Sequence, residues 1–211
     1  MGTINKGILG GFSGTVGTVI GGSWKGIAYM RSQPGKRSFN PSEKQLAQQA
    51  KFALIMRFLQ PMSALLEVTF SNLAVRMTGI NSALSYTIQN AVTGTYPTFT
   101  IDYALALVAR GDLPNALSPA VNAGAGSILT FSWTDNSGSG IASATDMAVM
   151  VAYCPAMKQA VYDVGGTRAG VTADLNASVF AGQQVETWIS FITQDGKKSA
   201  TSFFTGEVTV S

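Results

Sequence analysis

Short segments of apolar residues, separated by polar and turn-forming positions, recur along the second half of the chain. The pattern recurs in six segments rich in β-branched and aromatic residues, with turn signals such as Asp195-Gly196 between some of them. These segments are 127–134, 146–153, 157–163, 169–175, 184–193 and 200–210. Six or seven short strands at this spacing predict an immunoglobulin/fibronectin-III-like β-sandwich over 122–211. Trp133 and Trp188 lie on different predicted strands, and we expect both in its core.

Residues 39–121 instead favour a helical region followed by one strand. Asn40 is the predicted N-cap, with Pro41 in the first turn and Glu43 completing a capping box. The apolar stripe of this helix consists of Leu46, Ala50, Ala53, Leu54 and Phe58. Pro61 interrupts the helical pattern, which resumes toward Leu73, and a second helix is predicted over 82–91. An alternating strand is predicted over 99–109, and the Pro-, Asn- and Gly-containing stretch 113–126 predicts a domain boundary.

The N-terminal stretch GILGGFSGTVGTVIGGSWKGIAYMRS (7–32) contains eight glycines. Its glycine spacing fits neither a phosphate-binding nor a dinucleotide-binding loop. Large apolar residues interleave with the glycines, which is not typical of a flexible linker. We predict two strands, 15–20 and 23–31, joined by a turn at Gly21-Gly22, within a β-hairpin arm over 1–38. Because an isolated hairpin is marginally stable, this arm is expected to join another sheet. The predicted fold class is therefore mainly β with an α-helical region.

Charged residues make up only 12% of the 211 residues, about half of the usual share. So few charges favour a surface that contacts other protein, although a small domain solvated by Ser and Thr would have a similar composition. The chain has no apolar run of about 18 residues and no signal-peptide pattern. We therefore predict no membrane insertion, synthesis in the cytoplasm, and incorporation into a virion or another released assembly.

The charges are unevenly distributed along the chain. Residues 1–60 contain eight basic groups and one acidic group, a net charge of +7, whereas residues 61–211 contain six basic and ten acidic groups, a net charge of −4. This asymmetry suits either a nucleic-acid-facing end or head-to-tail docking between copies. Basic and aromatic residues also alternate around Trp24-Lys25 and Tyr29-Met30-Arg31, which would permit non-specific contact with single-stranded nucleic acid.

Residues that usually carry catalysis are scarce. The chain has no histidine and a single cysteine, Cys154, which lies in a predicted strand and is expected in the core. Serine–histidine triads, thiolate clusters and common zinc sites are thereby excluded. Asp102 and Asp112 are the best carboxylate pair, but both are better explained as residues at the ends of one strand. We predict no enzymatic activity, no catalytic residues, no metal site and no cofactor.

Three stretches carry a resemblance that spans essentially the whole chain. They are GILGGFSGTVGTVIGGSWKG (7–26), SYTIQNAVTGTYPTFTIDYALALVARGDLP (85–114) and TWISFITQDGKKSATSFFTGEVTV (187–210). In these stretches the chain resembles an uncharacterised family of roughly 200-residue proteins from Bacteroidetes-type bacteria and associated phages. The resemblance implies no activity and no functional residue, because the function of that family is not established.

These observations lead to two functional hypotheses. The first is a non-enzymatic structural protein that self-assembles through its N-terminal arm, as a subunit of a phage or phage-like particle, tube or filament, with itself and other particle proteins as partners. The predicted assembly residues are Phe12, Val16, Val19, Ile20, Trp24, Lys25, Tyr29, Arg31, Lys36 and Arg37. The alternative is a soluble immunoglobulin-like binding module that recognises a ligand, a glycan or a partner protein.

Overall fold

The computed structural model describes residues 2–4, 10–35, 40–73 and 77–211. The chain divides into two compact units, Met1–Ser42 and Glu43–Ser211. The predicted division placed boundaries after residues 38 and 121, and the second of these falls inside a strand of the sandwich.

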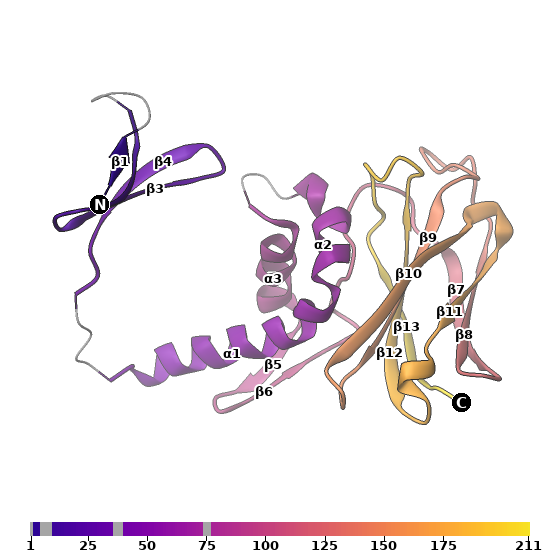
Figure 1. Cartoon of the computed structure of the whole chain (residues 1–211). Helices are drawn as coiled ribbons and strands as arrows, with labels where there is room; N and C mark the ends of the chain where they lie inside the picture. The colour runs from indigo at the N-terminus through magenta and orange to yellow at the C-terminus, as the bar shows by residue number, and fades with distance from the viewer. Residues whose placement is uncertain (1, 5–9, 36–39, 74–76) are drawn as a thin grey trace. The chain divides into compact units, whose positions relative to one another are not determined.

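The N-terminal unit is one antiparallel sheet in the order β1-β2-β3-β4 (Figure 1). Its strands are β1 (Thr3–Ile4), β2 (Phe12–Val16), β3 (Val19–Trp24) and β4 (Ile27–Ser32). The predicted turn at Gly21-Gly22 is wrong, because both glycines lie inside β3. The turns are instead the two-residue connections 17–18 and 25–26, on either side of β3. The predicted two-stranded hairpin is thus part of a four-stranded meander.

The second unit contains three α-helices and nine strands among the described residues. The helices are α1 (Glu43–Leu59), α2 (Ser63–Thr69) and α3 (Gly79–Asn90), with 3-10 turns η1 (Gln60–Met62), η2 (Ser71–Leu73), η3 (Arg168–Gly170) and η4 (Ser178–Phe180). The strands are β5 (Val92–Thr95), β6 (Thr98–Ile101), β7 (Leu117–Gly124), β8 (Ile128–Thr134), β9 (Met147–Cys154), β10 (Gln159–Thr167), β11 (Thr172–Asn176), β12 (Gln184–Ile192) and β13 (Phe203–Thr209). The protein is therefore mainly β with one helical region, as the sequence predicted.

Seven strands form the immunoglobulin/fibronectin-III-like sandwich. A four-stranded sheet in the order β10-β9-β12-β13 packs against a three-stranded sheet in the order β11-β8-β7. Hairpins join β7 to β8, β9 to β10 and β12 to β13, and the remaining connections cross between the sheets. The six predicted strands all occur, with ends displaced by up to four residues.

Strand β7 lies where the sequence predicted a domain boundary. Its residues, LSPAVNAG, have the composition of a loop, but they pair with β8 from Leu117 to Gly124. The pairing is irregular between Leu117 and Ala120, around Pro119. Tertiary pairing therefore overrides the local preference of these residues for a turn or loop.

The helical region covers the outer face of the four-stranded sheet, so that this unit has three layers (Figure 1). An aromatic cluster joins the helices to the sheet, since the Phe58 ring lies 5.0 Å from that of Tyr153 and 5.8 Å from that of Trp188. The indole N–H of Trp188 donates a hydrogen bond to the carbonyl of Ala106 at 3.1 Å. Trp133 packs on the other side of the sheet, 5.4 Å from the Phe191 ring. Both tryptophans are buried, as predicted, but in different clusters.

Strand β9 is buried on both faces because it lies in the middle layer. Ala148, Met150 and Ala152 contact the cluster between the two sheets, whereas Val149 and Val151 contact the cluster beneath the helices. Its uninterrupted apolar run is the pattern expected of a strand covered on both sides. Cys154, at the end of β9, is a buried free cysteine, as predicted.

Three predicted element boundaries in the helical region need correction. Helix α1 begins at Glu43 rather than just after Asn40. Helix α3 begins at Gly79, and its N-cap is Thr78, whose hydroxyl accepts a hydrogen bond from the N–H of Asn81 at 3.3 Å. The predicted strand over 99–109 ends at Ile101. There the carboxylate of Asp102 accepts a hydrogen bond from the N–H of Ala104 at 3.1 Å, which favours a turn over a continued strand.

The helical stretch Glu43–Thr69 is long and apolar enough, by length and composition, to cross a membrane. The same properties occur in core helices of soluble proteins. In this fold the end of α1 and most of α2 contribute to the cluster beneath the helices, through Phe58, Leu59, Leu65 and Leu66.

Candidate functional site

Two tight turns bring β2, β3 and β4 of the N-terminal unit together. In the first turn Gly17 has φ +58°, and in the second Lys25 and Gly26 have φ +47° and +82°. Turns with positive φ at the first or at both central residues match the twist of antiparallel strands. The glycine-rich sequence therefore provides both turns of this sheet, the one before β3 and the one after it.

Strand pairing assigns the side chains of this unit to two faces. Trp24 lies opposite Ile27, and Ile20 lies opposite Arg31. Residues that face each other across an antiparallel pair point to the same side of the sheet. Because side chains alternate along each strand, Ile20, Trp24, Ile27 and Tyr29 share one side with Arg31. We call these five residues the aromatic face.

The other side of the sheet is partly covered by its own residues. Val16 lies opposite Val19, and Gly21 lies opposite Met30. A Cβ atom at Gly21 would overlap the ring and the backbone oxygen of Phe12. Gly21 is also the only buried residue among those described in this unit. Because residue 21 is a glycine, Phe12 can approach the backbone of β3 closely. Gly21 and Gly22 therefore serve as strand residues and not as a turn.

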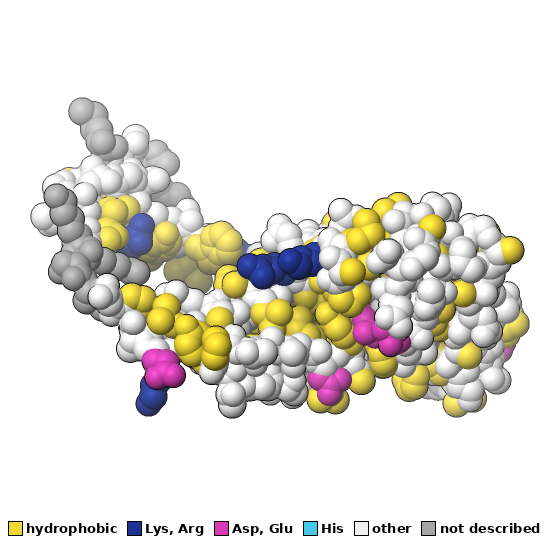
Figure 2. Space-filling view, turned by 90° about the horizontal axis from the view of Figure 1, so that it is seen from below, with side chains coloured by type: hydrophobic (Ala, Val, Ile, Leu, Met, Phe, Trp, Pro, Cys, Tyr) yellow, Lys and Arg dark blue, Asp and Glu magenta, His cyan; other side chains and the backbone are white. Residues whose placement is uncertain are grey.

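The aromatic face is open to solvent. Trp24 is 57% exposed, Ile27 is 53% exposed and Tyr29 is 48% exposed. Tyr29 lies over Gly22, since a Cβ atom there would come within 3.0 Å of its hydroxyl. Figure 2 shows hydrophobic side chains at the surface of this unit. A sheet with so many exposed apolar groups and no buried side chain among its described residues gains little from folding alone, so we regard it as the candidate functional site.

The predicted assembly residues occupy different parts of this unit. Ile20, Trp24, Tyr29 and Arg31 are on the aromatic face, Phe12, Val16 and Val19 are on the opposite side, and Lys25 is in the second turn. Lys36 and Arg37 lie outside the described residues. Ile27 and Met30, both more than half exposed, were not among the predicted residues. Both lie in the same short sequence as Tyr29 and Arg31: Ile27 stands two residues before Tyr29, and Met30 stands between Tyr29 and Arg31. Those positions were the signal that could have identified them.

Arg168 is a buried charge in the sandwich that the sequence analysis did not identify. Its Nε atom donates to Asp146 at 3.2 Å, and its guanidinium also donates to Asn136 at 2.6 Å and to the carbonyl of Pro114 at 2.8 Å. Burial lowers the pKa of Arg168 below its ordinary value, against the opposing effect of Asp146. Its partners all belong to the same unit, so this network stabilises the fold and offers no open position to a ligand.

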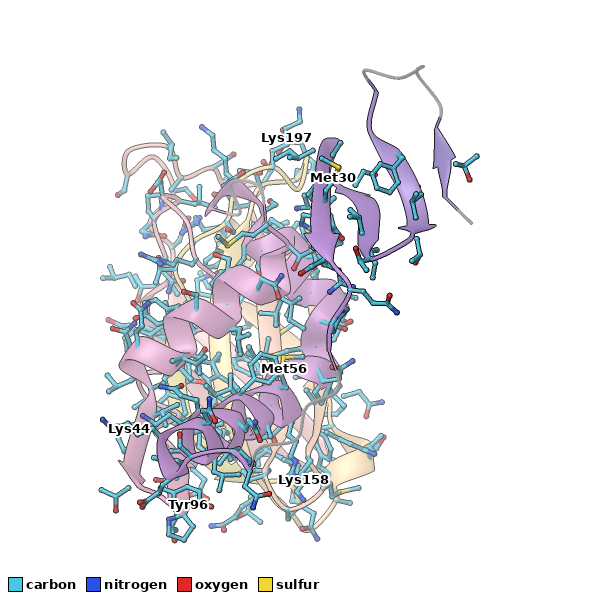
Figure 3. The ribbon with its side chains drawn as sticks, turned by 90° about the vertical axis from the view of Figure 1, so that its left-hand side faces the viewer. Met30, Lys44, Met56, Tyr96, Lys158 and Lys197 are labelled. Atoms are coloured by element: carbon cyan, nitrogen blue, oxygen red, sulfur yellow. The ribbon has the colours of Figure 1, made fainter. Side chains whose placement is uncertain are left out.

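A pocket of about 640 Å³ lies between the loop before β9 and the loop after β12. Its lining is made of Ile141, Ser143, Thr145, Asp146, Thr193, Gln194, Asp195, Lys197 and Lys198. Loops at this end of an immunoglobulin-like sandwich bind ligands in other proteins. Lys197, labelled in Figure 3, is 3.4 Å from Asp195, and both side chains are largely exposed. The pocket can accept a small molecule, but no buried side-chain nitrogen or oxygen among the described residues lacks a hydrogen-bond partner.

The remaining titratable groups do not form a catalytic arrangement in the described part of the chain. Asp102 is engaged with the backbone of Ala104, and Asp112 is exposed on a loop. Burial raises the pKa of Tyr103 to about 12, so this hydroxyl is a weaker acid than an ordinary tyrosine. Within the described ranges, no three His, Cys, Asp or Glu side chains are grouped so that they could hold a metal ion.

Comparison with known proteins finds one matching family for this chain. A family model described as a family of unknown function (DUF6266) matches residues 11–206. The match includes β2, β3 and β4 as well as the helical region and most of the sandwich. Neither the curated proteins nor the solved structures include a match to the chain.

Proposed function

The chain belongs to this family of unknown function, DUF6266, and from the exposed N-terminal sheet we propose that it is a non-enzymatic structural protein that self-associates. The sheet formed by β2, β3 and β4 is the association element, and the three-layered unit is the body that it connects to other copies. Many such copies would form a particle, tube or filament. The phage-type identity of that assembly is supported by the sequence resemblance alone.

The observation that carries this proposal is the combination of apolar exposure with the lack of a buried side chain among the described residues of the N-terminal unit. Trp24, Ile27 and Tyr29 expose about half of their surface each, and all six residues of β4 are exposed. Burying a large apolar side chain stabilises a protein by roughly 1.5–3 kcal/mol. Contact with another copy would supply the burial that this sheet does not have by itself.

A second candidate function, that of a ligand-binding module, is favoured by the pocket at residues 141–146 and 193–198. It would need neither an exposed sheet nor association between copies. A chain that remains monomeric at all concentrations and binds a small polar molecule at this pocket would support it over the structural role.

The first testable prediction concerns the aromatic face. In a chain that carries both Trp24→Ser and Ile27→Ser, we expect association to weaken at least about tenfold, because two exposed apolar groups are removed. Light scattering and sedimentation velocity across a range of concentrations provide the measurement.

The matched control replaces two sandwich residues of similar exposure, Leu117 at 53% and Val179 at 59%, with Ser. Association of this control is expected to equal that of the wild type. A wild-type chain that stays monomeric, or a control that loses association as strongly, would contradict the proposal.

A further inference from the structure

Strand β4 is an unprotected edge of the N-terminal sheet. In the described part of the chain it pairs with β3 only, and its six residues are all exposed. Its sequence, IAYMRS, has one charge and neither Pro nor Gly, and its pairing with β3 is regular over all six positions. An edge strand with these properties offers unpaired backbone groups to another strand.

Three of the four edge strands of the sandwich differ from β4 in this respect. Pro119 and an irregularity interrupt β7, and another irregularity interrupts β10 between Gly165 and Thr167. Gly206, with φ +110°, distorts β13. Proline, bulges and distortion are the usual features that prevent edge-to-edge pairing. These three edges are therefore protected, whereas β4 is open. The fourth edge, β11, pairs regularly with β8 but is only five residues long and includes the acidic Asp174.

The direction of the free backbone groups on β4 follows from one hydrogen bond. The N–H of Gln33, directly after β4, donates to the carbonyl of Thr18 at 2.7 Å, on the side of β3. Backbone groups of successive residues in a strand point to opposite sides. Those of Arg31, Tyr29 and Ile27 therefore point toward β3, and those of Ala28, Met30 and Ser32 point toward the free edge.

We propose that β4 pairs antiparallel with β4 of a second copy about a two-fold axis, merging two four-stranded sheets into one. This inference rests on the proposed self-association and adds an edge contact to it; edge pairing joins the two aromatic faces into one larger surface and does not itself bury them. Only residues whose backbone groups point outward can form the new hydrogen-bonded pairs. The longest overlap places Met30 opposite Met30 of the second copy, and Ala28 opposite Ser32.

This register has a consequence for the side chains. Outward-pointing residues pair only with each other, so the aromatic faces of both copies lie on the same side of the joined sheet. Tyr29 of one copy then lies directly opposite Arg31 of the other, where a cation–π contact stabilises the pair. Shifting one β4 strand along the other to the next register, in either direction, would lose one hydrogen-bonded pair. In one of these two registers the two Arg31 side chains would also lie directly opposite each other, where like charges repel.

A cysteine at position 30 tests this register directly. Met30 lies on the edge strand (Figure 3) and is 71% exposed, and the natural Cys154 is buried in the sandwich. In Met30→Cys the two thiols would face each other, with Cα atoms about 5.5 Å apart, within disulfide range. In the control Ala28→Cys the two positions are four residues apart along the strands, roughly 13 Å, which is beyond that range.

We expect a disulfide-linked dimer from Met30→Cys under mild oxidation and little from Ala28→Cys. Equal cross-linking of both variants, or cross-linking of Ala28→Cys alone, would overturn the register. Wild-type chain that associates in light scattering while Met30→Cys does not cross-link would overturn the strand pairing but leave the self-association in place. Wild-type chain that is monomeric would instead contradict the self-association itself.

A proline at the same position separates backbone pairing from side-chain packing. Met30→Pro removes an N–H that points away from β3, so the sheet can keep its own pairing. Loss of this donor in both copies should weaken dimerisation at least about tenfold, whereas Met30→Thr, which keeps the N–H, should dimerise like the wild type. NMR contacts between Trp24 and Ile27 would verify that the sheet is intact in both variants. Equal dimerisation of the two variants would overturn the proposal.

Discussion

Three tryptophans of this chain have three different environments. Trp24 is 57% exposed on the aromatic face, Trp133 is 5% exposed between the sheets, and Trp188 is fully buried beneath the helices. Each buried indole N–H has a backbone acceptor, the carbonyl of Arg168 for Trp133 and that of Ala106 for Trp188. Trp24 shows that a large aromatic side chain on a strand need not belong to a core. Its exposure is the residue-level sign of an interaction surface.

At the same scale, we expect Trp188→Ala to lower the free energy of unfolding by roughly 3–5 kcal/mol, because it removes the centre of the cluster that joins the helices to the sheet. Trp188→Phe keeps a ring in the cluster but leaves the carbonyl of Ala106 without its donor, so it should cost less, about 1–3 kcal/mol. Urea unfolding provides both values. A change below about 1 kcal/mol for the alanine variant would mean that the helices do not depend on this contact.

At the scale of elements, β12 and β13 place two carboxylates side by side. Glu186 lies directly opposite Glu207 in the antiparallel pair. Burial, and next the charge of Glu207, raise the pKa of Glu186 above its ordinary value. Like charges at directly opposed positions destabilise a sheet. This pair therefore makes the sandwich less stable as the pH rises, whereas a carboxylate in a stabilising salt bridge makes a protein more stable as the pH rises.

A prediction on pH dependence follows from the sign of this shift. Folded protein binds a proton at Glu186 more tightly than unfolded protein does, so its contribution to stability increases as the pH falls through the raised pKa toward 4.5, the ordinary value. Glu207→Gln should raise the free energy of unfolding at pH 7 by about 0.2–1 kcal/mol and reduce the gain on acidification.

The difference between variant and wild type isolates this pair, because other carboxylates titrate in both proteins. Asp112→Asn, which removes an exposed carboxylate outside the two strands, is the matched control. Urea unfolding at pH 5 and pH 7 provides the comparison. A variant that is less stable than the wild type at pH 7 would show that Glu207 has a favourable partner instead.

At the scale of the whole molecule, the two units differ in charge and in packing. Residues 1–42 contain five basic groups and no acidic group, a net charge of +5. The second unit contains the three-layered core and all the acidic residues. Pairing β4 with β4 would bring two basic units together, whereas head-to-tail docking would bring a basic unit onto an acidic one. The two arrangements therefore respond to salt in opposite directions.

We expect association to strengthen as salt rises from about 0.05 to 1 M, because the Debye length falls to about 3 Å and screens the repulsion between the basic units. Reversal of Lys36 and Arg37 to Glu should likewise strengthen association at low salt. Sedimentation velocity at both salt concentrations measures each effect. Weaker association at high salt, with further loss in the reversal variant, would indicate head-to-tail docking.

Some features of this protein were determined by the sequence alone. Short segments rich in β-branched and aromatic residues identified six of the seven strands of the sandwich, because strands that line a core need such residues at their buried positions. Burial of Trp133 and Trp188 followed from their places on those strands. The glycine-rich segment was recognised as β structure because large apolar residues interleave with its glycines.

Only the tertiary structure decided which surfaces those elements cover. Strand β7 has the composition of a loop and exists through its pairing with β8, and Gly21 lies inside β3 because Phe12 occupies the space of its missing side chain. Likewise, Trp188 faces the helices because its partners, such as Ala106, approach from 82 residues away. Such contacts join residues distant in sequence, and a local pattern contains no information about them. The same reason hid the open edge of β4, since an edge is defined by the neighbour that a strand does not have.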